Sequence, residues 1–464
     1  METDHPTKWI AEELQGITLP DKRFSANIIS IAERLAEYSG FSFSAACGER
    51  LRKSAWRLFS TEELELLSVH QHRTMDRCAT EQIILIVEDT TDIVYRQQQK
   101  QGMGELGSTK SKAIKGLNMH TALALSDAGE PLGIIHQQIW APKVHQRATT
   151  NTSKIAIEDK ETIKWINTLK TVNRCWQQQQ QQQVVLISDR EADFFEHYGQ
   201  PRQDNIKLLV RVQQKKRIVQ YKDKKLSIAQ VLKQLTPLGQ GQVRVWRRPN
   251  QPERIAQVHY YATTITLPPT YKQKLAARTM QLVWIKEEQE PPPEQQVVEE
   301  NKKKAEPIEW VLLTDLAADS LQEVVTIGSY YACRWTAERF HYILKSGLHI
   351  EQVQIDSYVR LVNALQLYAL IGWHLLWLQR LAKANGDQAA SEFIESQTLE
   401  AAQAVSGKQI STVKDFLVVT AVLGGFIPTR KQPLPGEKTL WLGLRQLLAI
   451  RKGFIAAKLK YGTG

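Results

Sequence analysis

Two stretches decide the fold: Ile83-Ile84-Leu85-Ile86-Val87, followed by Glu88-Asp89-Thr90-Thr91, and Val184-Val185-Leu186-Ile187, followed by Ser188-Asp189-Arg190-Glu191-Ala192-Asp193. Each begins as an unbroken aliphatic run, which predicts a strand buried on both faces of a sheet. In each, an aspartate stands two residues after the last aliphatic residue. Because sites in α/β sheets form at the carboxyl ends of strands, we expect Asp89 and Asp189 to face one another.

The chain around these strands alternates between strand and helix patterns. Residues 117–125 and 132–140 alternate apolar and polar side chains around Asp127-Ala128-Gly129, which predicts a hairpin. Residues 158–176 predict a helix, and 206–212 a third buried strand. This order favours an α/β fold, a mixed sheet flanked by helices, in a domain at 66–383.

The middle of the chain is strongly basic. Residues 201–250 hold thirteen Lys and Arg but only two Asp, in a chain whose formal net charge is +11. This excess points to an anionic partner, although many basic proteins bind no nucleic acid. We interpret 213–306 as a β-rich insertion whose far end, 286–307, is a flexible loop rich in Pro and Glu. The seven glutamines at 177–183 predict an exposed loop or a helix extension.

Helical patterns dominate both ends of the chain. With 464 residues, two to four domains are expected. Residues 1–65 are either a small helical bundle or a DNA-binding domain, and 384–464 form a helical C-terminal domain. Four scattered cysteines and no signal-peptide pattern favour the cytoplasm. Polar residues interrupt the apolar stretch at 361–382, which favours a core helix over a membrane span.

A predicted long helix, about 319–348, carries a third carboxylate. Tyr331, Arg334, Glu338 and Lys345 fall within an arc of about 60° on it. Together with Asp89 and Asp189, Glu338 would complete a three-carboxylate site of the kind that Mg²⁺ or Mn²⁺ prefers. Two alternatives stay open. Each aspartate is then only a helix N-cap or a turn former, and the charged face of the helix is only a solvated stripe with pairs between neighbouring turns.

The spacing of these residues carries a family resemblance. Tyr331-x2-Arg334-x3-Glu338-x6-Lys345 matches the Y-R-E-K signature of insertion-sequence DDE transposases. Glu88-Asp89-Thr90-Thr91 with Tyr95-Arg96 resembles their first-aspartate motif, and Asp189 to Asp193 their second. Weaker matches at 35–40, 107–108, 310–314 and 423–426 extend the likeness. The chain thus resembles Tn-five-like transposases of the insertion-sequence-four family nearly end to end.

This resemblance implies a fold and an activity. It implies an RNase H-like catalytic core with a β-rich insertion, in which Asp89, Asp189 and Glu338 are catalytic and hold two Mg²⁺ ions, with Mn²⁺ as a substitute. Such enzymes cut both strands at the element ends through a hairpin and join the 3′ ends to target DNA by two-metal phosphoryl transfer. The alternatives are a catalytically silent end-binding inhibitor and a structure-selective nuclease on the same core.

The resemblance also implies DNA contacts. Trp310 would stack on an extruded base, unless it is simply a core residue, and Trp335 would wedge into the gap. The DNA partner would be double-stranded, both the inverted-repeat ends of the element and the target DNA. The protein partner would be a second copy of the chain, in a homodimer built on helices near 440–460. The protein would be cytoplasmic and nucleoid-associated, with no membrane contact. The remaining expected DNA-binding residues are Tyr331, Arg334, Lys345, Arg190, Arg211, Lys215, Lys216, Arg217, Arg23 and Ser25.

Overall fold

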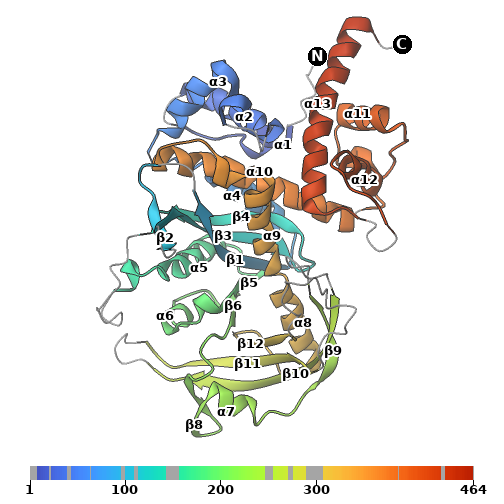
Figure 1. Ribbon diagram of the computed structural model, residues 1–464. Helices are drawn as coiled ribbons and strands as arrows, with labels where there is room; N and C mark the ends of the chain where they lie inside the picture. The colour runs from blue at the N-terminus through green and yellow to red at the C-terminus, as the bar shows by residue number, and fades with distance from the viewer. Residues whose placement is uncertain are drawn as a thin grey trace.

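The computed structural model describes residues 8–19, 22–38, 43–62, 64–95, 100–108, 113–142, 156–245, 254–269, 275–288, 307–384, 386–429 and 434–462. These residues form a mixed α/β fold with one 12-stranded sheet and helices at both ends of the chain (Figure 1). The predicted fold class is confirmed, and the arrangement is compatible with an RNase H-like core.

The core of the sheet has both parallel and antiparallel strands. The strand order in this core is β4-β3-β1-β5-β6. Strand β1 is antiparallel to β3 and parallel to β5, and β5 is parallel to β6. Helix α5 (Ile163–Cys175) precedes β5, and the short helix α6 (Phe195–Tyr198) precedes β6. The strands are β1 (Ile83–Val94), β2 (Gly104–Ser108), β3 (Ala113–Ser126), β4 (Pro131–Trp140), β5 (Gln183–Ser188) and β6 (Ile206–Arg211).

The first strand is longer than its aliphatic run predicts. It continues to Val94, and Asp89 pairs with Thr121 of β3 inside the strand. The neighbouring β5 pairs with β1 only as far as Val87 and Ile187. Asp89 therefore lies beyond the end of its parallel neighbour but within a strand, because β3 still supplies the backbone partners.

The basic insertion extends the same sheet. Strand β12 pairs with β6 on one side and β11 on the other, so the insertion continues the core sheet, and its predicted β-rich character is confirmed. Lys286 and Glu287 belong to β11, whereas most of the predicted Pro-rich loop, 289–306, lies outside the described residues. The insertion holds β7 (Ile218–Tyr221), β8 (Lys224–Ser227), α7 (Ile228–Leu232), β9 (Gly239–Val245), β10 (Arg254–Leu267) and β11 (Arg278–Glu287). Strand β12 (Glu309–Thr314) follows it.

The predicted long helix is divided. A capping box between Ser320 and Glu323 begins α8 (Leu321–Ala332), which packs on β9 and β10. After a turn at Cys333 and Arg334, α9 (Trp335–Tyr342) packs on β1, and a π-helical turn, Ile343–Gly347, follows. Tyr331, Arg334, Glu338 and Lys345 therefore lie on α8, the turn, α9 and the π turn, respectively.

Helix α10 (Tyr358–Ala384) lies between the sheet and the terminal helices (Figure 1). Among the described residues, one segment, Tyr358–Leu381, is long and apolar enough to cross a membrane, and 78% of its most apolar window is buried inside the protein. It packs against β4, α3 (Phe43–Phe59) and α13 (Glu437–Tyr461), as the predicted core helix would. The glutamine run forms turns between α5 and β5, and Gln182 bonds to the carbonyl oxygens of Cys78 and Glu81.

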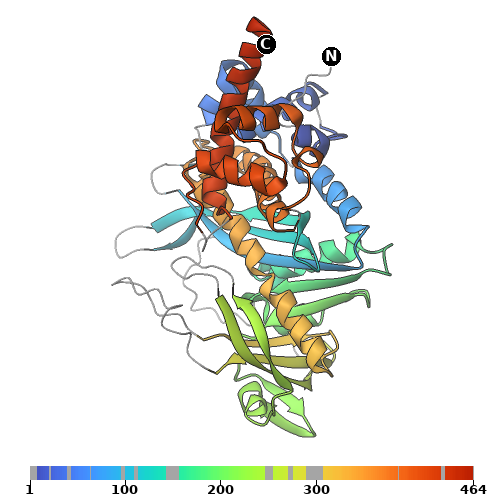
Figure 2. The same cartoon turned by 90° about the vertical axis from the view of Figure 1, so that its right-hand side faces the viewer.

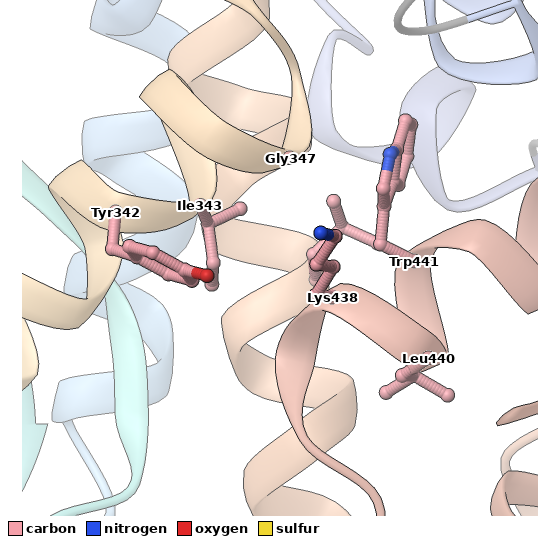
Figure 3. A pocket seen from close by; sticks show the side chains of 7 residues that line it. Tyr342, Ile343, Gly347, Lys438, Leu440 and Trp441 are labelled. Carbon is pink, nitrogen blue, oxygen red and sulfur yellow. The ribbon is translucent and has the colours of Figure 1, made fainter. Parts of the chain in front are cut away.

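The terminal helices gather at one end of the molecule, beyond α10, and the insertion strands lie at the other end (Figures 1 and 2). Lys452 of α13 donates to Glu37 of α2 at 2.6 Å, which ties the two ends of the chain together. Trp441 and Lys438 of α13 line a small pocket against Ile343 and Gly347 of the π turn (Figure 3). The helices are α1 (Lys8–Glu13), α2 (Lys22–Glu37), α3 (Phe43–Phe59), α4 (Leu67–Cys78), α11 (Ser396–Ser406), α12 (Val413–Leu423) and α13 (Glu437–Tyr461).

Candidate functional site

Asp89 lies in β1, and Asp189 immediately follows the adjacent strand β5. The register Val87 to Ile187 places the two aspartates two residues further along parallel neighbours. Asp189 also caps the 3₁₀ turn Arg190–Ala192, because its Oδ1 accepts from the backbone N–H of Glu191 at 2.8 Å. Its role as an N-cap therefore coexists with its place beside Asp89.

The two carboxyl groups have different electrostatic environments. Burial raises the pKa of Asp189 to about 6, and repulsion from Asp89 adds to this effect. Burial also acts to raise the pKa of Asp89, but His341 and the positive charge of Arg334 bring it below its usual value. His341 Nδ1 lies 3.5 Å from Asp89 Oδ2. Asp89 is therefore the better neutralised of the pair.

Arg334 joins the third carboxylate to this site. Its Nη1 lies 3.7 Å from Asp89 Oδ1, and its Nη2 forms an ion pair with Glu338. The Arg334 side chain is only 9% exposed, so these ion pairs are largely shielded from solvent. One guanidinium thus gathers carboxylates from β1 and α9, next to Asp189 at the end of β5.

The donor chemistry fits a divalent metal, but the present side-chain arrangement is not a metal cluster. Asp89, Asp189 and Glu338 offer carboxylate oxygens, and the repulsion between the aspartates marks a place where a cation is favoured. Across the part of the chain that the structure describes, no three His, Cys, Asp or Glu side chains are close enough to hold an ion. Arg334 is the cation that contacts Asp89 and Glu338 here.

A polar cavity of about 270 Å³ opens beside Asp189. Trp310, 2% exposed, forms part of its wall and meets Tyr331 edge to face, with ring centroids 5.0 Å apart. Four arginines bring positive charge to a cavity that also offers an aromatic ring, which is the chemistry that a phosphate and a nucleobase require. Its lining includes Asp189, Arg190, Arg211, Arg254, Trp310, Tyr331 and Arg334.

The other two residues of the helical motif lie nearby. Lys345 Nζ donates to the carbonyl oxygen of Asp92 at 2.6 Å, which fixes the π turn to β1 three residues past Asp89. Among the residues that the structure describes, Trp335 does not line the cavity. Its ring lies under Arg334, with Cζ 5.6 Å from the ring centroid. The structure thus places Trp335 against Arg334 rather than in the cavity wall.

The predicted phosphate contacts fall into two groups. Arg190 and Arg211 line the cavity, and Lys216 is exposed on the insertion. Lys215 pairs with Glu309 at 2.7 Å, and Arg217 pairs with the fully buried Asp193. Asp193 also accepts from the Tyr198 hydroxyl and the Gln213 N–H, so Arg217 helps to anchor the second-aspartate motif.

Two site residues escaped the sequence analysis. Arg254 lines the cavity and makes a bidentate ion pair with Glu287, with N–O distances of 2.5 and 2.7 Å. His341 contacts Asp89 from α9. A signal existed only for His341, which stands one helical turn after Glu338 on the same helix. Arg254 belongs to none of the recognised motifs.

The N-terminal helices carry the remaining predicted residues. Arg23 and Ser25 lie on α2; the Arg23 side chain is outside the described part of the structure, and Ser25 is half-buried. A family model described as "Transposase DNA-binding" matches residues 6–64, which span α1, α2 and α3. This match supports a transposase that binds DNA, and it favours a DNA-binding domain over a plain helical bundle at this end.

Proposed function

We propose that this chain is a cut-and-paste DDE transposase of the Y-R-E-K type, similar to the insertion-sequence-four family. The observation that carries the proposal is the grouping of Asp89, Glu338 and Arg334 beside Asp189, at the edge of a cationic cavity. The match of residues 6–64 to a transposase DNA-binding model supports DNA as the substrate.

Asp89, Asp189 and Glu338 would hold two divalent ions, Mg²⁺ or Mn²⁺. When bound, such ions activate an attacking water or 3′-hydroxyl and stabilise the leaving oxygen. The chain itself contributes positioning. Arg334 is close enough to both Asp89 and Glu338 to keep their charges balanced before metal binding, and its guanidinium is suited to hold a DNA phosphate once they bind metal.

The cavity supports a distorted DNA strand as the bound species. Arg190 and Arg211 would hold phosphates, and Trp310, which is buried in the cavity wall against Tyr331, would have to become accessible on DNA binding to stack on an extruded base. Stacking of one base on an aromatic ring contributes about 1–3 kcal/mol, which offsets part of the cost of extruding that base. A strand bent in this way is what hairpin formation at an element end requires.

A homodimer acting on paired ends belongs to the same proposal. The apolar face of α13 is the candidate surface, although Trp441 and Leu447 of that helix are already buried within the chain. Light scattering of the protein with and without end DNA tests this part. A dimer in the presence of DNA is expected, and a complex with one copy per pair of ends contradicts it.

The activity is tested with DNA that carries the inverted repeats flanking the gene. With Mg²⁺ the parent should cut both strands through a hairpin and join 3′ ends to a plasmid, whereas Glu338→Gln should bind the ends but cut at least about 1000-fold more slowly. The matched control is Glu400→Gln, in a half-buried α11 residue paired with Lys458, and it should cut normally. If the parent binds the ends but does not cut them, the protein is an end-binding inhibitor. If it cuts the ends but does not join them to target DNA, it is a nuclease.

A further inference from the structure

A buried polar network adjoins the two aspartates, and the proposed chemistry does not use it. Glu88 and Ser188 each precede an aspartate, and both are 0% exposed. The Ser188 hydroxyl donates to Glu88 Oε1 at 2.5 Å. A buried carboxyl needs such partners, because an unpaired one costs far more free energy than its hydrogen bonds return.

His120 of β3 completes the network. Its Nε2 lies 3.1 Å from Glu88 Oε2 and 3.0 Å from the Thr168 hydroxyl, and its Nδ1 lies 2.9 Å from the Thr90 hydroxyl. The Thr168 hydroxyl donates to the Lys164 carbonyl, so it is free to accept from His120. One proton assignment satisfies the three contacts of His120: Thr90 donates to Nδ1, and Nε2–H donates to Glu88 and Thr168.

The network replaces a missing backbone link. Backbone pairing between β1 and β5 ends at Val87 and Ile187, one residue before Glu88 and Ser188. The hydrogen bond between Ser188 and Glu88 is therefore the lateral connection nearest to the two aspartates. Because successive side chains of a strand point to opposite faces, this bond lies on the other face of the sheet from Asp89.

We propose that Glu88, Ser188 and His120 are positioning residues that fix the separation of Asp89 and Asp189 for metal binding. The inference rests on the proposed function, since it concerns the same two carboxylates. Carboxylate pairs accept a divalent ion only at a defined spacing, and partners that orient metal ligands typically contribute 10- to 100-fold to metal affinity. Backbone pairing already holds the two strands together as far as Val87 and Ile187, and the bond from Ser188 to Glu88 adds the next link between them, directly before the two aspartates.

The test measures Mn²⁺ affinity by electron paramagnetic resonance on the full chain without DNA, together with the thermal midpoint. Ser188→Ala should raise the Mn²⁺ dissociation constant at least about 10-fold. Ser126→Ala is the matched control: Ser126 is equally a buried strand serine with a hydrogen bond, from the Glu130 N–H at 3.2 Å, but it pairs with Ile84 at the far end of β1. It should lower the thermal midpoint similarly and leave Mn²⁺ affinity unchanged.

Glu88 offers a graded comparison. Glu88→Gln keeps an oxygen acceptor for Ser188, and should stay within about 3-fold of the parent affinity, whereas Glu88→Ala should match the loss in Ser188→Ala. Parent-like Mn²⁺ affinity in Ser188→Ala, or equal losses in Ser188→Ala and Ser126→Ala, would overturn the positioning role. If Asp89→Asn leaves Mn²⁺ binding of the parent unchanged, the proposed metal site itself fails, and the network's role in it fails too.

Discussion

Arg334 Nη1 lies 3.7 Å from Asp89 Oδ1, and the same guanidinium forms an ion pair with Glu338. Arg334, in the turn before α9, therefore neutralises one carboxylate from β1 and one from the first turn of α9. Charges so shielded from water are costly unless they are paired. The free energy of unfolding should accordingly depend on this arginine until another cation takes its place.

Replacing Arg334 with Gln should lower the free energy of unfolding by about 2–4 kcal/mol in buffer with EDTA, because Asp89 and Glu338 then lack their cation. Mg²⁺ should restore much of this loss, since the ion supplies positive charge to the same carboxylates. Urea denaturation with EDTA and with Mg²⁺ measures both effects. Arg451→Gln, which breaks the pair of a buried arginine with Glu395 in the C-terminal domain, is the control. If Mg²⁺ stabilised both variants equally, the interpretation of Arg334 would be wrong.

The carboxyl of Asp189 should make stability depend on pH in the opposite sense to an ion-paired acid. Its folded pKa, about 6, is above the usual value of 3.8 for an aspartate, so the folded chain holds the proton more tightly than the unfolded chain. The resulting cost is absent below about pH 4, grows as the pH rises through 6, and is complete above it.

Asp189→Asn removes this cost and keeps an N-cap side chain. In EDTA it should be more stable than the parent by about 1–2 kcal/mol at pH 7.5, once solvent screening is allowed for, and no more stable at pH 4. Urea denaturation from pH 4 to 8 measures the difference. A constant difference over that range would show that charge repulsion at Asp189 is not its source. Saturating Mg²⁺ should reverse the sign at pH 7.5, because only the parent offers the full carboxylate set.

The sequence predicts the local features of this site and misses those made by distant pairing. The aliphatic runs identified both strands and the place of Asp189. The extension of β1 through Asp89 depends on β3, some thirty residues away, whose register cannot be derived from the run itself. Likewise, His120 reaches Glu88 only because Thr90 and His120 are paired across β1 and β3.

The helix motif shows a second limit. A period of 3.6 residues placed Lys345 on one face with Arg334, but the π turn at Ile343–Gly347 adds residues per turn and shifts that register. Hydrophobic spacing does not distinguish the two helix types over five residues. Lys345 still reaches β1, at the carbonyl of Asp92, because tertiary contacts rather than helical phase fix its position.

Trp310 should decide how well the protein holds an extruded base. Trp310→Ala should slow hairpin formation about 5- to 160-fold, corresponding to the loss of about 1–3 kcal/mol of stacking, and Trp310→Phe should recover part of it. Fluorescence of 2-aminopurine placed next to the cleavage site reports extrusion directly. Trp284→Phe is the control, since Trp284 packs against Tyr261 on the neighbouring strand and is not in the described cavity lining. Normal extrusion in Trp310→Ala would leave Trp310 as a core residue.

Arg190 and Arg217 both belong to the predicted phosphate contacts, yet the structure gives them different environments. Arg190 is exposed at the cavity, so Arg190→Ala should weaken end binding and reduce the slope of log K against log salt by about 1, with little change in stability. Arg217 pairs with Asp193, which is fully buried, so Arg217→Ala should lower the free energy of unfolding by about 2–4 kcal/mol. Filter binding between 50 and 300 mM salt and urea denaturation separate the two effects, with the exposed Lys408→Ala as a control for each. The slope of log K against log salt reports the number of phosphate contacts, and denaturation reports the loss of the buried pair. If Arg190→Ala lowered the free energy of unfolding but left the salt slope unchanged, Arg190 would be a structural residue and not a phosphate contact.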